Sequence, residues 1–281
     1  MSPKIAPVID LPELMSLLEG REGSAPVRLL DVRWALDGSK GRSTYLAGHL
    51  PGAVYIDLET QLAAPASPQA GRHPLPAARD LVATLRGAGA DEGMIFVGYD
   101  DTDGSQAGRL VWMLRALGLE AALLNGGLSA WDGELATDDV TPPAGDLAER
   151  DFAQAQLASI DEVAAAAVPV VDARAPERYR GDVEPVDPRA GHVPGAINLP
   201  FAGNVDETGR FLAPEALAAR FAGAGLDPQE EVIVYCGSGV TATHDLLALQ
   251  RAGYTRARLF PGSWSQWSAD PERPVASGAQ P

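Results

Sequence analysis

Cysteine and lysine are scarce in this sequence of 281 residues: Cys236 is the only cysteine, and Lys4 and Lys40 are the only lysines. A single cysteine excludes an intramolecular disulfide and any metal site built from a cluster of cysteines. The four histidines also fall in no close metal-ligand spacing. We therefore expect no metal or organic cofactor, and Cys236 is either an inert core residue or a nucleophile.

Long apolar runs are absent as well. No run approaches the roughly 18 residues that a membrane-spanning helix needs. The first 20 residues lack the basic region, the apolar stretch and the small-residue cleavage site of a secretory signal. With 46% hydrophobic and 21% charged residues, the composition is that of a globular protein. We expect a cytoplasmic protein without a membrane partner.

Basic residues are outnumbered by acidic ones, 22 to 38, which gives a formal net charge of -16. This charge would repel nucleic acid and anionic membranes. Each side of residue 140 carries 11 basic and 19 acidic residues, so neither half is a charged tail. The equal division is an early indication of a duplicated chain.

The sequence repeats itself at a domain-sized period. Four segments of the first half recur in the same order in the second half, at offsets of 136 to 143 residues. The pairs are LLDVRW (29–34) with VVDARA (170–175), GHLPGAVYIDL (48–58) with GHVPGAINLPF (191–201), IFVGYDD (95–101) with VIVYCGS (232–238), and NGGLSAW (125–131) with PGSWSQW (261–267). A period of this size indicates two related domains rather than a solenoid.

Each copy alternates short apolar runs with helical patterns, which is typical of an α/β fold with a parallel sheet covered by helices on both faces. Strands are predicted at 28–32, 53–56, 94–98 and 121–124, and at 169–172, 196–199, 232–235 and 257–260. Helices are predicted at 11–20, 77–89, 106–118, 215–225 and 240–253. We predict an N-terminal domain at 1–135, a polar linker at 136–155 and a C-terminal domain at 156–281.

The segment VIVYCGSGVTATHDLLAL (232–249) carries the clearest chemical signal. Cys236 follows a buried-type strand, at the edge where parallel α/β sheets place their ligand sites. Gly237 and Gly239 allow successive N–H groups to turn inward around the sulfur, and the following helix adds its positive N-terminal end. Such surroundings favour the thiolate and make Cys236 a candidate nucleophile.

These motifs together resemble the rhodanese-type sulfurtransferases in their tandem two-domain form, and within them the mercaptopyruvate branch. The resemblance covers nearly the whole chain. It rests on paired D-x-R strand ends (Asp31 to Arg33, Asp172 to Arg174), paired H-x-P-G-A turns at His49 and His192, paired G-x-S-x-W endings, and the loop CGSGVT (236–241).

The resemblance implies that Cys236 takes a sulfane sulfur from a small anionic donor, thiosulfate or 3-mercaptopyruvate, and forms a persulfide. The loop residues Gly237, Gly239, Val240 and Thr241 would cradle it. The acceptor would be cyanide, a thiol or a thioredoxin-like protein. Asp100 stands where the second copy has Cys236, so the resemblance implies that the first domain is catalytically inactive.

The same resemblance assigns the donor-binding arginine of D-x-R-x-x-x-R-Y/F to Arg178, and a second one, before the G-H-x-P-G turn, to Arg189. A guanidinium binds carboxylate or sulfonate-like groups through a bidentate fork. The alternative for each is a solvated charge or a structural ion pair. We expect Arg174 to be structural.

Three further residues have two interpretations each. The Ser238 hydroxyl is expected to bond the donor's carbonyl or relay a proton, in a catalytic role, or else to satisfy loop backbone. His49, with Asp37 before it, matches a proposed relay of the mercaptopyruvate branch, but His192 repeats the same turn, so His49 could equally anchor a loop. Trp34 would wall the donor pocket or belong to the core.

Two other functions compete with sulfur transfer. Cell-cycle dual-specificity phosphatases share this fold and use a cysteine loop, but they need an arginine six residues after the cysteine, where this chain has Ala242. The other alternative is a non-enzymatic sulfur carrier, sensor or interaction module with a degenerate domain pair. The retained Cys236 and its glycine-containing loop argue against degeneration.

Overall fold

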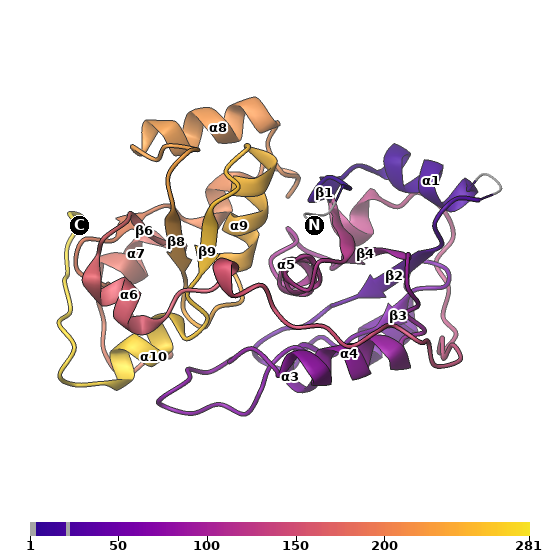
Figure 1. Ribbon diagram of the computed structural model, residues 1–281, viewed down its shortest axis with the longest axis horizontal. Coiled ribbons are helices and arrows are strands. Elements are labelled where there is room, and N and C mark those ends of the chain that lie inside the picture. Colours follow the sequence, from indigo (N-terminus) through magenta and orange to yellow (C-terminus); the bar gives the residue numbers. More distant parts are fainter. Residues whose placement is uncertain (1–3, 21–22) are drawn as a thin grey trace. The chain divides into compact units, whose positions relative to one another are not determined.

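The chain folds into two compact units, seen in a computed structural model that describes residues 4–20 and 23–281 (Figure 1). Unit 1 comprises the described residues up to Ala64 together with Pro76–Ala153 and Glu207–Phe211. Unit 2 comprises Pro65–Leu75, Gln154–Asp206 and Leu212–Pro281. The division at residue 153 falls inside the segment predicted as a linker, while two short segments pack with the opposite half of the chain.

Most of the expected linker, 136–155, packs against unit 1. Ala136 pairs with His49 in an isolated antiparallel bridge. Leu147 is fully buried, and its N–H donates to the carbonyl oxygen of Ala90 at 3.1 Å. The sequence of this stretch did not predict that it packs on unit 1, because backbone groups make most of these contacts and side-chain polarity does not report them.

Unit 1 contains a five-stranded parallel sheet in the order β1-β5-β4-β2-β3. Its strands are β1 (Val8–Ile9), β2 (Val27–Asp31), β3 (Val54–Tyr55), β4 (Ile95–Tyr99) and β5 (Glu120–Leu124). Its helices are α1 (Leu11–Glu19), α2 (Arg42–Ala47), α3 (Leu58–Gln61), α4 (Ala78–Gly87) and α5 (Ala107–Ala116), with a 3-10 turn at Gly127–Ala130. The two-residue β1 was not predicted, because so short a strand carries no apolar run of its own.

Unit 2 contains a four-stranded parallel sheet in the order β7-β6-β8-β9. Its strands are β6 (Val170–Asp172), β7 (Ile197–Asn198), β8 (Val232–Tyr235) and β9 (Ala257–Leu259). Its helices are α6 (Ile160–Ala165), α7 (Pro176–Arg180), α8 (Pro214–Gly223), α9 (Ala242–Arg251) and α10 (Ser263–Ala269), with 3-10 turns at Gln154–Gln156 and Phe201–Asn204. The predicted α/β class with two parallel-sheet domains is confirmed.

The longer helices were predicted because their apolar residues recur at helical spacing. Those expected at 106–118 and 240–253 are α5, which packs on β4 and β5, and α9, which packs on β8 and β9. The shorter helices α2, α3, α6, α7 and α10 were not predicted. Their four to seven residues complete too few turns to establish a period.

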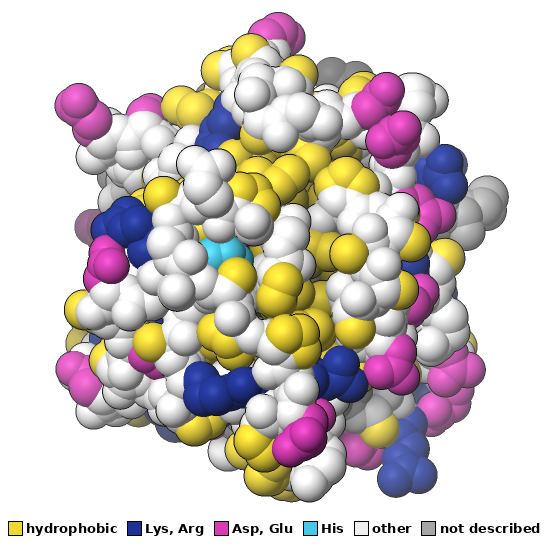
Figure 2. All heavy atoms as spheres, turned by 90° about the vertical axis from the view of Figure 1, so that its left-hand side faces the viewer, with side chains coloured by type: hydrophobic (Ala, Val, Ile, Leu, Met, Phe, Trp, Pro, Cys, Tyr) yellow, Lys and Arg dark blue, Asp and Glu magenta, His cyan; other side chains and the backbone are white. Residues whose placement is uncertain are grey.

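Each unit buries its own apolar core. In unit 1, Ile9, Leu14, Val97, Tyr99 and Leu124 belong to one cluster. In unit 2 the largest cluster members are Tyr179, Tyr235, Trp264 and Trp267. Among the described residues, no helix is long and apolar enough to cross a membrane. On the face drawn in Figure 2, acidic side chains are scattered around the periphery and apolar ones gather toward the middle.

Candidate active site

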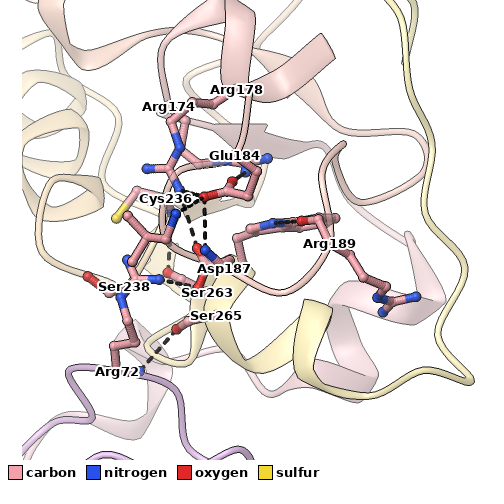
Figure 3. A network of polar contacts seen from close by, with 12 residues as sticks. Arg72, Arg174, Arg178, Glu184, Asp187, Arg189, Cys236, Ser238, Ser263 and Ser265 are labelled. Atoms are coloured by element: carbon pink, nitrogen blue, oxygen red, sulfur yellow. Dashed lines mark hydrogen bonds and ion pairs between the residues drawn. The ribbon is translucent and has the colours of Figure 1, made fainter. Parts of the chain in front are cut away.

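Cys236 lies directly after β8, in the loop that leads into α9. Its sulfur accepts a hydrogen bond from the backbone N–H of Gly239 at 3.1 Å, and its own N–H donates to Oγ of Ser263 at 3.2 Å. The side chain is buried, with 1% of the residue exposed. An N–H donor aimed at sulfur stabilises negative charge there. Figure 3 shows the thiol among the polar groups of this loop.

Two glycines are required for this loop, for different reasons. Gly239 has φ +80°, a conformation that favours glycine, and a β-carbon there would lie 2.4 Å from the carbonyl oxygen of Pro261. A β-carbon on Gly237 would lie 3.2 Å from Nη1 of Arg178 and 3.2 Å from Nη2 of Arg72. Two guanidinium groups therefore approach the backbone immediately after the cysteine.

Ser238 is hydrogen-bonded to His73, whose Nδ1 lies 2.7 Å from the serine Oγ. Both side chains are buried, with 7% and 6% of each residue exposed. His73 comes from Pro65–Leu75, the segment of the first half of the chain that packs in unit 2. Sequence reasoning missed His73 because nothing near it in the chain marks it as a partner of a loop 165 residues away.

Arg178 extends from the last turn of α7 and is held by two acidic side chains. Its Nη2 lies 2.6 Å from Oε1 of Glu184 and 3.2 Å from Oδ2 of Asp187. Burial acts to raise the pKa of Glu184, but the N–H of Asp187 and the guanidinium of Arg178 together hold that pKa below its usual range. The acidic pair fixes the arginine that was predicted to bind the donor.

Arg72 is a second cationic group at this loop, and it too was missed by sequence reasoning. Its Nη1 pairs with Oδ1 of Asp187, so one carboxylate bridges Arg72 and Arg178. The backbone N–H of Arg72 donates to Oγ of Ser265 at 3.1 Å (Figure 3). No sequence signal distinguished Arg72, because its neighbours in the chain form a stretch rich in alanine and proline without helical or strand periodicity.

Arg189 has a different environment from the one predicted. Its guanidinium donates to four backbone carbonyl oxygens, those of Trp267, Ser268, Asp270 and Arg273, at 2.5 to 3.0 Å. Figure 3 shows this side chain directed away from Cys236. These bonds tie the end of α10 to the loop before His192, so the structure gives Arg189 a structural role, and contact with the donor stays a prediction.

Arg174 is structural, as expected. It pairs with Asp172 through Nη2 at 2.6 Å and donates to the carbonyl oxygen of Gly191 at 2.7 Å. Unit 1 repeats the arrangement: Arg33 pairs with Asp31 and donates to the carbonyl oxygen of Gly48, both at 2.7 Å. The paired D-x-R motifs therefore fix the paired glycine-histidine turns to the strand ends.

His49 and His192 occupy equivalent places in the two units. Each ring stacks on a tyrosine of the preceding helix, with Nδ1 at 3.0 Å from the Tyr45 carbonyl oxygen for His49 and at 2.8 Å from that of Tyr179 for His192. This repetition favours the loop-anchoring interpretation of His49. Asp37, the suggested relay partner, is exposed and bonds Ser39.

Trp34 lies in unit 1 and is half-buried. Its contact with a donor, like that of His49, stays a prediction. In unit 2, Val240 is buried and Thr241 precedes the first residue of α9, where both complete the turn between Cys236 and the helix. Their part in cradling the donor stays a prediction.

Asp100 occupies the same place in unit 1 that Cys236 occupies in unit 2, directly after β4 and before α5. Its carboxylate is fully buried and accepts four backbone hydrogen bonds. Oδ1 receives the N–H groups of Thr102 and Gly104 at 2.9 and 3.1 Å, and Oδ2 those of Gln106 and Ala107, both at 3.0 Å. The equivalent loop of unit 1 is therefore closed around a side chain of its own.

The fold and the site define a duplicated parallel α/β protein in which the loop after the equivalent strand carries a cysteine in unit 2 and an aspartate in unit 1. The rhodanese-like domain family matches residues 13–134 and 154–270. The chain belongs to this family.

Two relatives of this chain are named as sulfurtransferases. SseB of Mycobacterium tuberculosis, provisionally named a thiosulfate sulfurtransferase, is 43% identical over 279 residues, which cover 96% of this chain and 97% of SseB. The 3-mercaptopyruvate sulfurtransferase of Escherichia coli K12 is 34% identical over 261 residues, covering 89% and 92% of the two chains.

A solved structure agrees with this. The crystal structure of SseA from Escherichia coli, a 3-mercaptopyruvate sulfotransferase by its description, superposes with a TM-score of 0.76 at 31% identity. It covers 93% of this chain and 100% of that one. The protein is thus an enzyme of the sulfurtransferase class. No group of acidic, histidine or cysteine side chains suited to hold a metal ion occurs among residues 4–20 and 23–281.

Proposed function

We propose that this enzyme moves a sulfane sulfur from 3-mercaptopyruvate or thiosulfate, through a persulfide on Cys236, to cyanide or a thiol acceptor. The observation that carries the proposal is the position of the Cys236 sulfur, 3.1 Å from the N–H of Gly239, in a loop approached by two guanidinium groups. The arrangement places anion-binding groups next to a nucleophile, as an anionic sulfur donor requires.

With thiosulfate, the Cys236 thiolate attacks the outer sulfur. A sulfur–sulfur bond forms to the enzyme, the donor's own sulfur–sulfur bond breaks, and sulfite leaves with the electron pair. The outer sulfur of the persulfide then bears the negative charge, which the N–H of Gly239 and the loop dipoles stabilise. Attack by cyanide on that sulfur forms thiocyanate and returns the thiolate.

With 3-mercaptopyruvate, the bond that breaks joins sulfur to carbon, so the leaving group is the enolate of pyruvate. The donor's thiol proton must reach that carbon to give pyruvate. The Ser238 hydroxyl, paired with His73 at 2.7 Å, supports a proton relay at this point. Thiosulfate needs no such step, because sulfite is a stable anion.

A specific thiol, such as a thioredoxin-like protein, would replace cyanide as acceptor by the same attack on the outer sulfur. A sulfur carrier without turnover remains the second candidate, since Cys236 alone would suffice to hold a sulfane sulfur. The cytoplasm, with no nucleic acid or membrane partner, is the proposed location. These points rest on the charge and composition of the chain.

The test is steady-state sulfur transfer to cyanide with each donor, comparing kcat/KM, for the wild type and for Cys236→Ser. We expect turnover with at least one donor, loss of turnover in Cys236→Ser, and an unchanged circular dichroism spectrum. Full activity in Cys236→Ser would overturn the persulfide mechanism. Stoichiometric persulfide formation without turnover would instead establish the carrier.

A further inference from the structure

Ser263, the first residue of α10, has a backbone conformation that favours glycine. Its φ is +53°, and among the described residues Ala166 is the only other non-glycine residue with a positive φ. Ala166 lies exposed at the end of α6, whereas Ser263 is fully buried. A residue with a β-carbon in this conformation is strained, and it persists only where the surrounding structure holds it there. The contacts of Ser263 must therefore offset its strain.

Unit 1 has a glycine at the equivalent position. In the repeated motif, Gly127 of NGGLSAW stands where PGSWSQW has Ser263, and the φ of Gly127 is also +53°. A β-carbon on Gly127 would lie 2.3 Å from the carbonyl oxygen of Asp100, so the turn of unit 1 leaves no room for a side chain. Only the unit that carries the cysteine therefore admits a serine at this turn.

The Ser263 hydroxyl is inserted between the ends of β8 and β9. In the parallel pairing of these strands, the N–H of Phe260 donates to the carbonyl oxygen of Val234 at 2.9 Å. The next bond of the pattern would join the N–H of Cys236 to the carbonyl oxygen of Phe260. Instead, Ser263 Oγ accepts from the Cys236 N–H at 3.2 Å (Figure 3) and donates to the Phe260 carbonyl oxygen at 3.0 Å. The hydroxyl therefore bridges the two strands at the point where their direct pairing stops.

The turn that begins with Ser263 holds both backbone groups of Cys236. The N–H of Cys236 is bonded to the serine hydroxyl, and the carbonyl oxygen of Cys236 accepts from the N–H of Trp264 at 3.0 Å. The main chain of the cysteine is therefore fixed on both sides. A fixed main chain keeps the Cys236 sulfur at its place 3.1 Å from the Gly239 nitrogen, and an attacking group held in one geometry reacts faster than a mobile one.

We propose that Ser263 is a positioning residue of the sulfur-transfer reaction. Its hydroxyl takes the place of the next bond between β8 and β9, and it holds Cys236 so that the sulfur faces the N–H groups of the loop during attack on the donor. The two hydrogen bonds of the hydroxyl offset the backbone strain at Ser263. The inference rests on the proposed function for the identity of the reaction, and it gives Ser263 no contact with the donor.

Three variants separate the hydroxyl from the backbone conformation. Ser263→Gly removes both the hydroxyl and the strain, and Gly127 shows that glycine takes this φ at the equivalent place. Ser263→Ala removes the hydroxyl and keeps the strain. Ala166→Gly is the matched control, because it relieves the same kind of strain, at φ +46°, on the exposed end of α6. If Ser263 only shaped the turn, Ser263→Gly would keep the activity of the wild type.

The first measurement is steady-state sulfur transfer to cyanide. We expect both Ser263 variants to lower kcat by about ten- to a hundredfold, the scale for a misplaced attacking group. KM for either donor should stay within about threefold, because the groups that bind the donor do not move. Ala166→Gly should stay within about twofold of the wild type in kcat and KM. Urea unfolding confirms that each variant is folded in the assay, and a wild-type kcat in folded Ser263→Gly would overturn the proposal.

Ser263→Ala decides the question if Ser263→Gly does not fold. A lower kcat with an unchanged KM in folded Ser263→Ala would support the positioning role. A wild-type kcat, or a change in KM as large as the change in kcat, would overturn it.

The second measurement needs no turnover. Cys236 is the only cysteine, so mass spectrometry after iodoacetamide treatment reports the alkylation rate of that sulfur alone. We expect Ser263→Gly to slow alkylation at pH 7 about fivefold or more, because the sulfur loses its fixed place beside the loop N–H groups, and Ala166→Gly to leave the rate unchanged.

The two measurements distinguish failure of this inference from failure of the proposed function. Slower alkylation of Ser263→Gly, in a protein whose wild type shows no turnover, would support the role of Ser263 and refute the proposed function. Turnover by the wild type, with kcat and the alkylation rate both unchanged in Ser263→Gly, would refute the role of Ser263 and leave the function intact.

Discussion

His73 Nδ1 lies 2.7 Å from Ser238 Oγ, which joins a residue of the first half of the chain to the loop that carries Cys236. The hydroxyl is two residues from Cys236, and the imidazole is almost wholly buried. An imidazole can accept the hydroxyl proton or hold the hydroxyl in one orientation. In either role, we expect the pair to act in the reaction with 3-mercaptopyruvate, the donor whose conversion needs a proton transfer.

Removal of the hydroxyl should therefore discriminate between donors. We predict that Ser238→Ala lowers kcat with 3-mercaptopyruvate by about 10²-fold, the usual scale for a lost proton-transfer group, and changes kcat with thiosulfate by less than about threefold. Ser268→Ala serves as control, since Ser268 is a buried serine of unit 2 whose Oγ has no partner among the described residues. Equal losses with both donors would show that Ser238 only shapes the loop.

A glycine pair tests the loop geometry. Gly239 and Gly253 both have φ between +80° and +90°, but only Gly239 has a neighbour, the carbonyl oxygen of Pro261, where a β-carbon would go. We predict that Gly253→Ala costs about 1–2 kcal/mol of unfolding free energy from backbone strain alone. Gly239→Ala should cost more and should abolish sulfur transfer, because the N–H that faces Cys236 moves.

Urea denaturation of the two variants measures the difference. If Gly239→Ala and Gly253→Ala are equally stable and equally active, then the close approach to Pro261 does not constrain the loop.

Asp245, in α9 behind the loop, should make stability depend on pH. It is fully buried with Asn204 as a hydrogen-bond donor, and burial raises the pKa of this carboxyl to about 7. In the unfolded chain the pKa is about 3.9. Between these values the native state holds a proton that the unfolded state has released, so the native state loses stability as pH rises from about 4 to 7.

Asp245→Asn removes this titration while keeping an oxygen that can accept from Asn204. We predict that its stabilisation relative to the wild type is near zero at pH 4, grows toward pH 7 and levels off above it, reaching at most about 4 kcal/mol. Urea midpoints at pH 4.5, 6 and 8 measure it. Glu215→Gln, at an exposed carboxylate on α8, should show no such trend. A stabilisation that is equal at all three pH values would contradict a raised pKa.

Much of the fold was predictable because it depends on local patterns. Among the described residues, eight of the nine strands and five of the ten helices carry a period or a bounded apolar run, and the repeated motifs of the two halves establish the duplication. The boundaries between the units were less predictable. Residues 65–75 and 207–211 cross over through backbone bonds and single side chains, which leave no composition signal.

The residues of the candidate site also fall into those that the sequence predicted and those that only the structure revealed. The sequence by itself determined that Cys236 is the nucleophile candidate, that its glycines must accommodate a tight loop, and that Asp100 replaces a second cysteine, because these residues are adjacent to a recognisable strand and helix. Only the tertiary structure decided which distant groups reach that loop. Arg72 and His73 arrive there, while Arg189 turns to the carbonyls of α10. The reason is that side-chain partnership across more than 100 residues depends on where the backbone is anchored, here through the N–H of Arg72 on Ser265, and no local pattern records such an anchor.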